Sequence, residues 1–115
     1  MQKKALDRRL GDRTRMVLGI KLPKEQPERP EMLAHTLDVS SWGARIGALH
    51  QWMDPGTVLV IQRKHSRVRC RVTWSRQVGP GEVQIGIEFL DRAPEFWGVD
   101  LEDGRAGVWL ADSER

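Results

Sequence analysis

The sequence RVRCRVTWSRQVGPGEVQIGIEFL, residues 67–90, carries the clearest strand pattern of the chain. Apolar and polar side chains alternate on both sides of VGPGE (78–82), whose glycines and proline indicate a turn. A period of two is typical of a β-strand with one buried face. The predicted inward residues are Val68, Cys70, Val72 and Trp74 in the first arm and Val83, Ile85, Ile87 and Phe89 in the second.

The same period appears along much of the remaining chain. TVLVIQRK (57–64) is expected to form a hairpin with the first of these arms. TRMVLGIKL (14–22) predicts one strand, and KEQPERP (24–30) predicts an exposed loop after it. A short strand is expected at ARI (44–46). Another strand is expected between the loop KEQPERP and the strand ARI. Its expected inward residues are Leu33, His35, Leu37 and Val39, and its expected outward residues are Ala34, Thr36, Asp38 and Ser40.

Six short strands in 115 residues indicate a single all-β domain, either a small antiparallel barrel or a sandwich. Closing the sheet into a barrel removes exposed strand edges. We expect an N-terminal arm over residues 1–13, the β domain over 14–91 and a C-terminal segment over 92–115. The last segment is predicted to contain a short helix with Pro94 in its first turn, or to be irregular.

The composition limits the classes of function. Lys and Arg number 19 against 16 Asp and Glu, a net charge of +3 that favours anionic partners only mildly. The single cysteine, Cys70, excludes an internal disulfide and a cysteine-built zinc site. No apolar h-region follows the basic N-terminus, and the longest aliphatic run is VLVI at 58–61. We therefore expect a soluble cytoplasmic protein that uses neither a metal nor a cofactor.

One cluster of polar residues lies in DVSSWGARI (38–46). Asp38 and Ser40 share the predicted outward face, where both can meet a ligand. Gly43 lets the backbone bend or approach another group closely. A carboxylate accepts hydrogen bonds only, so Asp38 complements the guanine edge that donates them.

A second cluster lies in DRRLGDRTR (7–15), where Arg9 and Arg13 are four residues apart in a segment without apolar periodicity. Such a segment can wrap around a ligand. The guanidinium fork matches the O6 and N7 acceptors of guanine, and it also pairs with phosphate oxygens.

These two motifs, in this order, resemble those of the PilZ domain. They are RxxxR, at Arg9 and Arg13, and DxSxxG, at Asp38, Ser40 and Gly43. The resemblance covers roughly residues 8–91, and it implies a six-stranded antiparallel β-barrel of the split-barrel type. It also implies binding of the bacterial second messenger cyclic di-GMP, usually as a stacked dimer, and no enzymatic reaction.

The resemblance implies a role for each residue of the candidate site. The arginines of the arm would contact guanine edges and phosphates, while the carboxylate and the hydroxyl would read a guanine from the barrel surface. Gly43 would shape the turn beneath the ligand, and Arg8, next to the motif, would add a phosphate contact or affect how many nucleotides bind. The implied ligand-binding set is Arg8, Arg9, Arg13, Asp38, Ser40 and Gly43.

The residues between the two arginines of RxxxR would oppose tight binding. Asp12 places a negative charge beside a phosphate site, and Gly11 raises the cost of ordering the arm. The hypothesis is that the arm is mobile without ligand, clamps onto the barrel when the nucleotide arrives, and so changes the surface presented to an unidentified protein partner.

Other interpretations remain open. A PilZ-like adaptor could act through protein contacts alone, and the arginines of RKHSRVRCRVTWSR (63–76) could bind nucleic acid, although an ordinary solvated face explains them as well. Asp38 and Ser40 could instead be turn formers that bond to nearby backbone N–H groups. A hydrolase triad with His35 is not expected, because the predicted inward direction of His35 separates it from the other two side chains.

Overall fold

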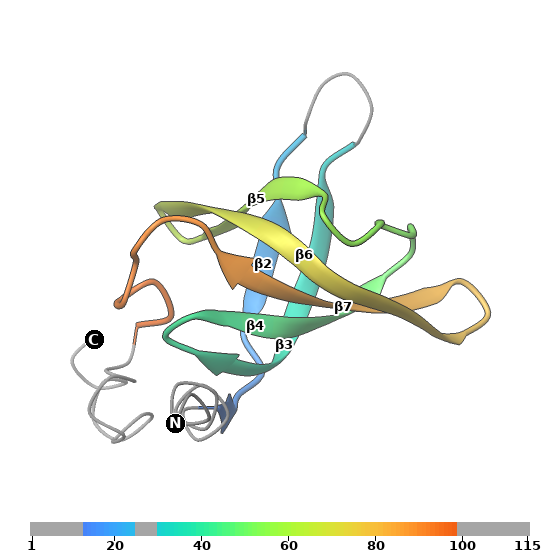
Figure 1. The fold of residues 1–115 in the computed structure, drawn as a ribbon, viewed down its shortest axis with the longest axis horizontal. Coiled ribbons are helices and arrows are strands. Elements are labelled where there is room, and N and C mark those ends of the chain that lie inside the picture. The colour runs from blue at the N-terminus through green and yellow to red at the C-terminus, as the bar shows by residue number, and fades with distance from the viewer. Residues whose placement is uncertain (1–12, 25–29, 99–115) are drawn as a thin grey trace.

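The structure is a computed structural model that describes residues 13–24 and 30–98, and over these residues the chain is all-β (Figure 1). Seven strands follow one another along the sequence. They are β1 (Thr14–Arg15), β2 (Gly19–Leu22), β3 (Met32–Ser40), β4 (Gly43–Leu49), β5 (Val58–Arg63), β6 (Ser66–Gly79) and β7 (Glu82–Phe89). Among the described residues, no helix is long and apolar enough to span a membrane.

The strands close into a six-stranded antiparallel barrel. Their order is β1-β3-β2-β5-β6-β7-β4, and an additional pairing of β3 with β4 joins the two sides of the sheet. β1 is the extra strand, which pairs with the C-terminal end of β3. This confirms the predicted barrel. Closure gives every barrel strand two neighbours, which protects the strand edges.

The two predicted hairpins are present. β5 and β6 pair across a turn at Lys64 and His65, and β6 and β7 pair across Pro80 and Gly81. Gly81 has a φ of 67°, a conformation that glycine adopts without steric cost. The tip of the β6–β7 hairpin projects beyond the rest of the barrel (Figure 1).

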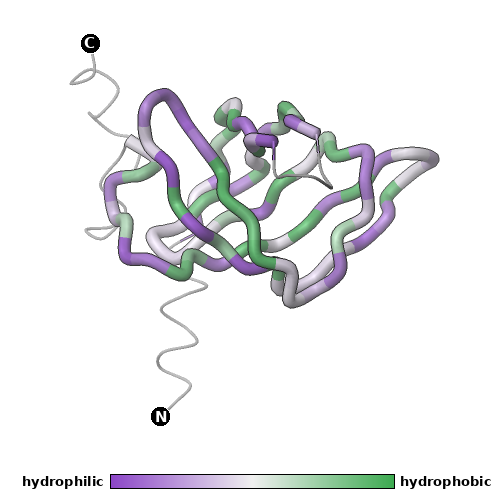
Figure 2. The backbone as a smooth tube through the Cα atoms, turned by 90° about the horizontal axis from the view of Figure 1, so that it is seen from above, coloured by the Kyte–Doolittle hydropathy of each residue, from purple (hydrophilic) through white to green (hydrophobic). Residues whose placement is uncertain are grey.

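Alternating side chains of β6 and β7 form much of the core, as predicted. Hydrophobic and hydrophilic residues follow one another along the strands (Figure 2). Trp74 differs from the prediction, because a bulge between Val72 and Trp74 shifts the register with β7 and leaves its ring partly exposed beneath the Arg76 guanidinium. The residues confirmed as buried are Val68, Cys70, Val72, Val83, Ile85 and Ile87.

The predicted inward face of β3 is wrong over its first half. Leu33 is 71% exposed, whereas Ala34 and Thr36 are buried. The cause is a shift in the β3–β4 register between Thr36 and Asp38, which leaves an extra residue, Leu37, on β3. Beyond this bulge Val39 is fully buried as predicted, but Asp38 and Ser40, which were predicted to lie on the outward face, are also buried, with exposed fractions of only 8% and 6%.

The segment predicted as one strand over 14–22 is two strands, β1 and β2. Arg15 lies opposite Asp38 and Gly19 lies opposite His35, so the three residues 16–18 face only the two residues 36 and 37. The predicted inward face survives this interruption. Ile20 and Leu22 are buried, and Met16 and Leu18 pack against the core while partly exposed.

Of the two forms predicted for the C-terminal segment, the described part takes the irregular one, since residues 94–97 are turns and form no helix; residues 99–115 of this segment lie outside the described residues. The amide of Phe96 donates to the carbonyl of Ala93, and that of Gly98 donates to the carbonyl of Glu95. Phe96 and Trp97 are buried and pack on Phe89 and on each other with ring centroids 4.9–5.7 Å apart. Burial of aromatic rings explains why this segment holds to the barrel without a helix.

Candidate functional site

The candidate site is centred on the carboxylate of Asp38 on β3, a residue that is only 8% exposed. Nη1 of Arg13 lies 2.5 Å from its Oδ1. On the other side, Nε and Nη2 of Arg45 lie 3.1 and 3.0 Å from its Oδ2. Each carboxylate oxygen therefore has its own guanidinium, and a nearly buried negative charge is paired twice.

The pairing of strands brings these three side chains together. Arg13 directly precedes β1, whose Arg15 lies opposite Asp38, and Arg45 of β4 lies opposite Asp38 on the other side of β3. Opposite residues of an antiparallel pair have neighbouring side chains. The Asp38 carboxylate on β3 therefore lies between Arg45, which belongs to β4, and Arg13, which directly precedes β1.

Arg45 is absent from the set of residues predicted from the sequence. The signal for it is the short connection between β3 and β4, because Ser40 lies opposite Gly43 across Ser41 and Trp42. Counting back from such a turn places Asp38 opposite Arg45. The sequence contains this information, but only after the hairpin register is known.

Ser40 has a structural role in the free protein. Its hydroxyl oxygen accepts a hydrogen bond of 3.0 Å from the amide of Trp42. Its carbonyl accepts another, of 2.9 Å, from the indole of Trp97. These contacts match the turn-forming alternative for Ser40, whereas Asp38 bonds to arginines and not to the turn. The two polar side chains of DxSxxG thus have different roles, since Ser40 stabilises the turn and Asp38 pairs with arginines.

Gly43 is required for close backbone packing. A Cβ atom at this position would collide with the carbonyl oxygen of Ile87 and come within 2.9 Å of the Cα of Glu88. Both atoms belong to the backbone of β7, which cannot rotate away as a side chain can. Of the two roles expected for Gly43, the structure therefore supports close approach, and the partner is β7.

The structure brings together part of the predicted ligand-binding set. Arg13 and Asp38 are in contact, and Ser40 and Gly43 lie in the adjoining turn. Arg8 and Arg9 lie outside the described residues. Asp38 offers acceptor oxygens and Arg13 and Arg45 offer donors, an arrangement that suits recognition of a polar, anionic ligand.

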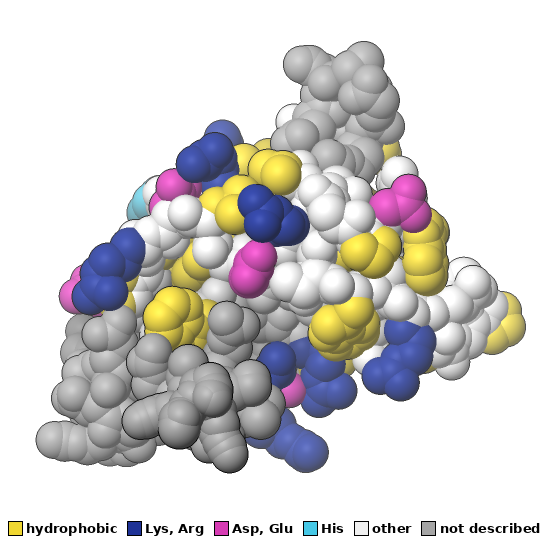
Figure 3. All heavy atoms as spheres, in the orientation of Figure 1, with side chains coloured by type: hydrophobic (Ala, Val, Ile, Leu, Met, Phe, Trp, Pro, Cys, Tyr) yellow, Lys and Arg dark blue, Asp and Glu magenta, His cyan; other side chains and the backbone are white. Residues whose placement is uncertain are grey.

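The arginines of β6 are paired with neighbouring side chains. Arg69 makes two hydrogen bonds to Asp91, of 3.0 and 3.2 Å, which raise the pKa of Arg69 and lower that of Asp91. Arg71 lies 3.4 Å from Glu88, and Arg67 donates to Gln62. Acidic side chains also lie beside several Lys and Arg side chains in Figure 3. The positive charge of the β6 arginines is therefore partly neutralised, which weakens the case for nucleic-acid binding.

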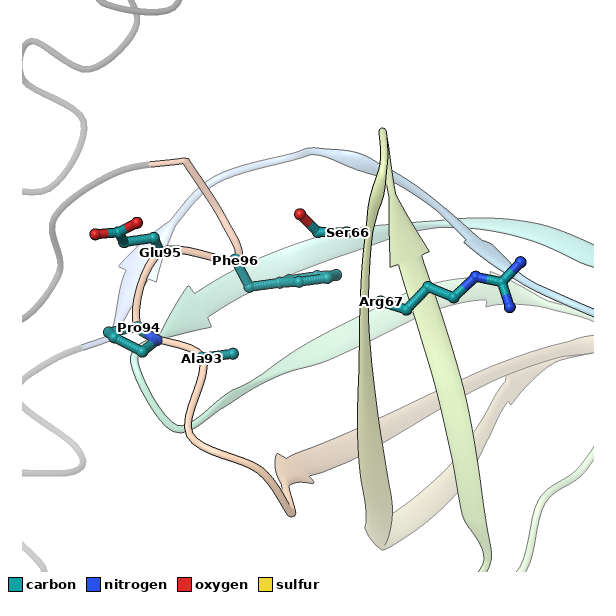
Figure 4. Close-up of a pocket in the computed structure, with 6 residues that line it drawn as sticks. All are labelled: Ser66, Arg67, Ala93, Pro94, Glu95 and Phe96. Carbon is teal, nitrogen blue, oxygen red and sulfur yellow. The ribbon is translucent and has the colours of Figure 1, made fainter.

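Away from this cluster, a hollow lies between the start of β6 and the segment that follows β7 (Figure 4). The ring of Phe96 points toward β6, but the Arg67 guanidinium and the Glu95 carboxylate point away from each other. A ligand there would meet no convergent set of polar groups. Within the described residues, no group of three or more His, Cys, Asp or Glu side chains is placed to hold a metal ion.

No protein-family model matches this sequence, and a search of curated proteins finds no significant match.

Proposed function

We propose that this protein is a non-catalytic sensor that binds cyclic di-GMP and relays the signal to a protein partner. The contact between Arg13 and Asp38 carries the proposal most directly. These residues are 25 positions apart, yet their side chains meet at 2.5 Å. They belong to the two motifs that resemble those of the PilZ domain, and their contact puts Arg13, the second arginine of RxxxR, beside the strand that carries DxSxxG.

The chemistry of the proposed complex follows from the donors and acceptors of the site. Asp38 would accept hydrogen bonds from the N1 and N2 groups of a guanine, and arginine forks would donate to its O6 and N7 atoms or to phosphate oxygens. Arg8 and Arg9 would complete the arginine set. Cyclic di-GMP carries two guanines and two negative charges, which matches this combination.

The proposed mechanism is an exchange of partners at Asp38. Arg13 occupies Oδ1 in the free protein, so a guanine has to compete with it. Arg45, on β4 of the barrel wall, holds Oδ2 and keeps the carboxylate in place when Arg13 moves to the ligand. The change in the arm then alters the surface available to a partner. The proposed setting is the bacterial cytoplasm.

A calorimetric titration with cyclic di-GMP tests the proposal. Arg13→Ala and Asp38→Ala should each weaken binding about tenfold to a hundredfold, because each removes hydrogen bonds worth about 1–3 kcal/mol. Arg67→Ala is the matched control, since Arg67 lies on β6 and bonds only to Gln62 among the hydrogen bonds described above. Cyclic di-AMP should bind at least tenfold more weakly if guanine is read.

Two results of this titration would contradict the proposal. Absence of binding by the unmodified protein would reject it outright. Binding that is equally strong in both variants and in the control would place the ligand elsewhere on the molecule.

A nucleotide-free adaptor is the second candidate function. The observation in its favour is that the polar groups of the motif already have internal partners, namely two arginines for Asp38 and the Trp42 amide for Ser40. Equilibrium dialysis distinguishes the two functions, because an adaptor of this kind retains no cyclic di-GMP at any concentration up to the millimolar range.

A further inference from the structure

We infer that Thr36 is a positioning residue, whose hydroxyl clips the segment between β1 and β2 to the barrel and thereby directs Arg13 to Asp38. The clip is a property of the free protein. Its consequence for ligand capture rests on the proposed function.

The clip consists of three hydrogen bonds at the interruption between the two strands. The Thr36 hydroxyl donates to the carbonyl of Met16 at 2.5 Å and accepts from the amide of Leu18 at 2.8 Å. The backbone amide of Thr36 donates to the carbonyl of Leu18 at 3.0 Å. One threonine therefore binds both ends of the segment that breaks the strand.

The hydroxyl is needed because the strand register changes at this point. Three residues, 16–18, face two residues of β3, so backbone groups of this segment cannot all find ladder partners. Thr36 is fully buried, so water does not take the place of its hydroxyl. An unpaired buried amide or carbonyl is costly, which explains a polar side chain at an inward position of β3.

The position of the clip connects it to the candidate site. Met16 is the first residue after β1, and β1 consists of only Thr14 and Arg15. A pairing of two residues holds a chain weakly by itself, so the anchor at 16–18 fixes the direction in which the chain continues toward Arg13. Thr36 and Asp38 lie on the same strand, two residues apart, and each holds one part of this N-terminal segment.

The test compares Thr36→Val with Thr36→Ser by amide hydrogen exchange and by titration with cyclic di-GMP. Valine keeps the shape of the side chain and removes the hydroxyl, while serine keeps the hydroxyl. We expect Thr36→Val to speed exchange of the Leu18 amide by about tenfold or more and to weaken nucleotide binding by about fivefold to tenfold. Thr36→Ser should restore both quantities to near the values of the unmodified protein.

Thr73→Val serves as the matched control, because Thr73 is an exposed residue of β6 and the same substitution there leaves the clip intact. The amide of Ile85, in the core of β7, reports whether the barrel of each variant remains folded. An effect on Leu18 without an effect on Ile85 localises the change to the clip.

Each outcome bears on the inference. Unchanged exchange of Leu18 in a folded Thr36→Val variant would overturn the clip, and faster exchange with unchanged binding would overturn its positioning role. If Thr36→Val does not fold, exchange of the Leu18 amide is measured in the unmodified protein instead. A Leu18 amide that exchanges there as in an unstructured chain would also overturn the clip. If the unmodified protein binds no cyclic di-GMP, the proposed function fails. The clip is then tested by Leu18 amide exchange alone.

Discussion

Asp38 shows how one residue can be both part of the fold and part of a candidate site. Its carboxylate is paired by Arg45, which belongs to the barrel, and by Arg13, which belongs to the chain leading into it. Removing either arginine leaves a nearly buried charge with one partner instead of two, a change that costs stability even without ligand. Binding and stability therefore have to be measured separately for every variant of this cluster.

Cys70 gives a prediction at the same scale. It is fully buried, and burial raises the pKa of its thiol from 9.0 to about 12. The unfolded chain loses this proton at lower pH than the folded protein does, so folding is progressively disfavoured as the pH rises between about 9 and about 12. Urea unfolding at pH 8 and pH 10 should show a larger loss of stability in the unmodified protein than in Cys70→Ala.

The same burial makes the thiol inert at neutral pH. An aromatic disulfide reagent should label Cys70 only as fast as the protein unfolds. Rapid labelling of the folded protein, or an identical pH dependence in Cys70→Ala, would contradict this account of the thiol.

The β3–β4 hairpin places the candidate site, and its geometry depends on close contact with β7. The short turn brings Asp38 opposite Arg45, and Gly43 allows β4 to lie against the backbone of Ile87. A longer turn would change the register and separate the two charged residues. At this scale the requirement for glycine is steric.

Two glycine substitutions test the role of this hairpin. Gly43→Ala should destabilise the protein by about 2–4 kcal/mol, because a Cβ atom there collides with backbone that cannot move aside. Gly19→Ala is the matched control in another strand, since a Cβ at Gly19 meets nothing within 4 Å. Its effect on the free energy of unfolding should be within about 1 kcal/mol. Equal losses in the two variants, measured by urea unfolding, would rule out the steric explanation.

The hairpins β5–β6 and β6–β7 could be predicted from sequence because their pattern is local. Residues that alternate along each arm, such as Val68 and Cys70, need only the period of the strand itself to be assigned. The inward face of β3 could not be predicted in this way, since the extra residue Leu37 is defined by the register with β4. Arg45 was missed for the same reason, as it becomes a neighbour of Asp38 only through pairing between strands.

At the scale of the whole molecule, ligand binding to the folded barrel can be measured as an increase in its stability against unfolding. A ligand that binds only the folded protein stabilises it by about 2.7 kcal/mol when present at a hundred times its Kd. Cyclic di-GMP at that excess should raise the melting temperature by roughly 10 °C in the unmodified protein. Asp38→Ala should show a much smaller rise at the same concentration, and a rise equal to that of the unmodified protein would contradict the assigned site.

The hydrogen bond from the indole of Trp97 to the carbonyl of Ser40 spans 57 positions of sequence. Arg13, the first described residue, contacts Asp38, and Trp97, nearly the last, contacts Ser40. Asp38 and Ser40 lie about 7 Å apart along β3. The described part of the chain therefore begins and ends beside the candidate site. The barrel has a suitable layout for a single-chain energy-transfer reporter, in which rearrangement of either contact changes the distance between a donor and an acceptor at these two ends.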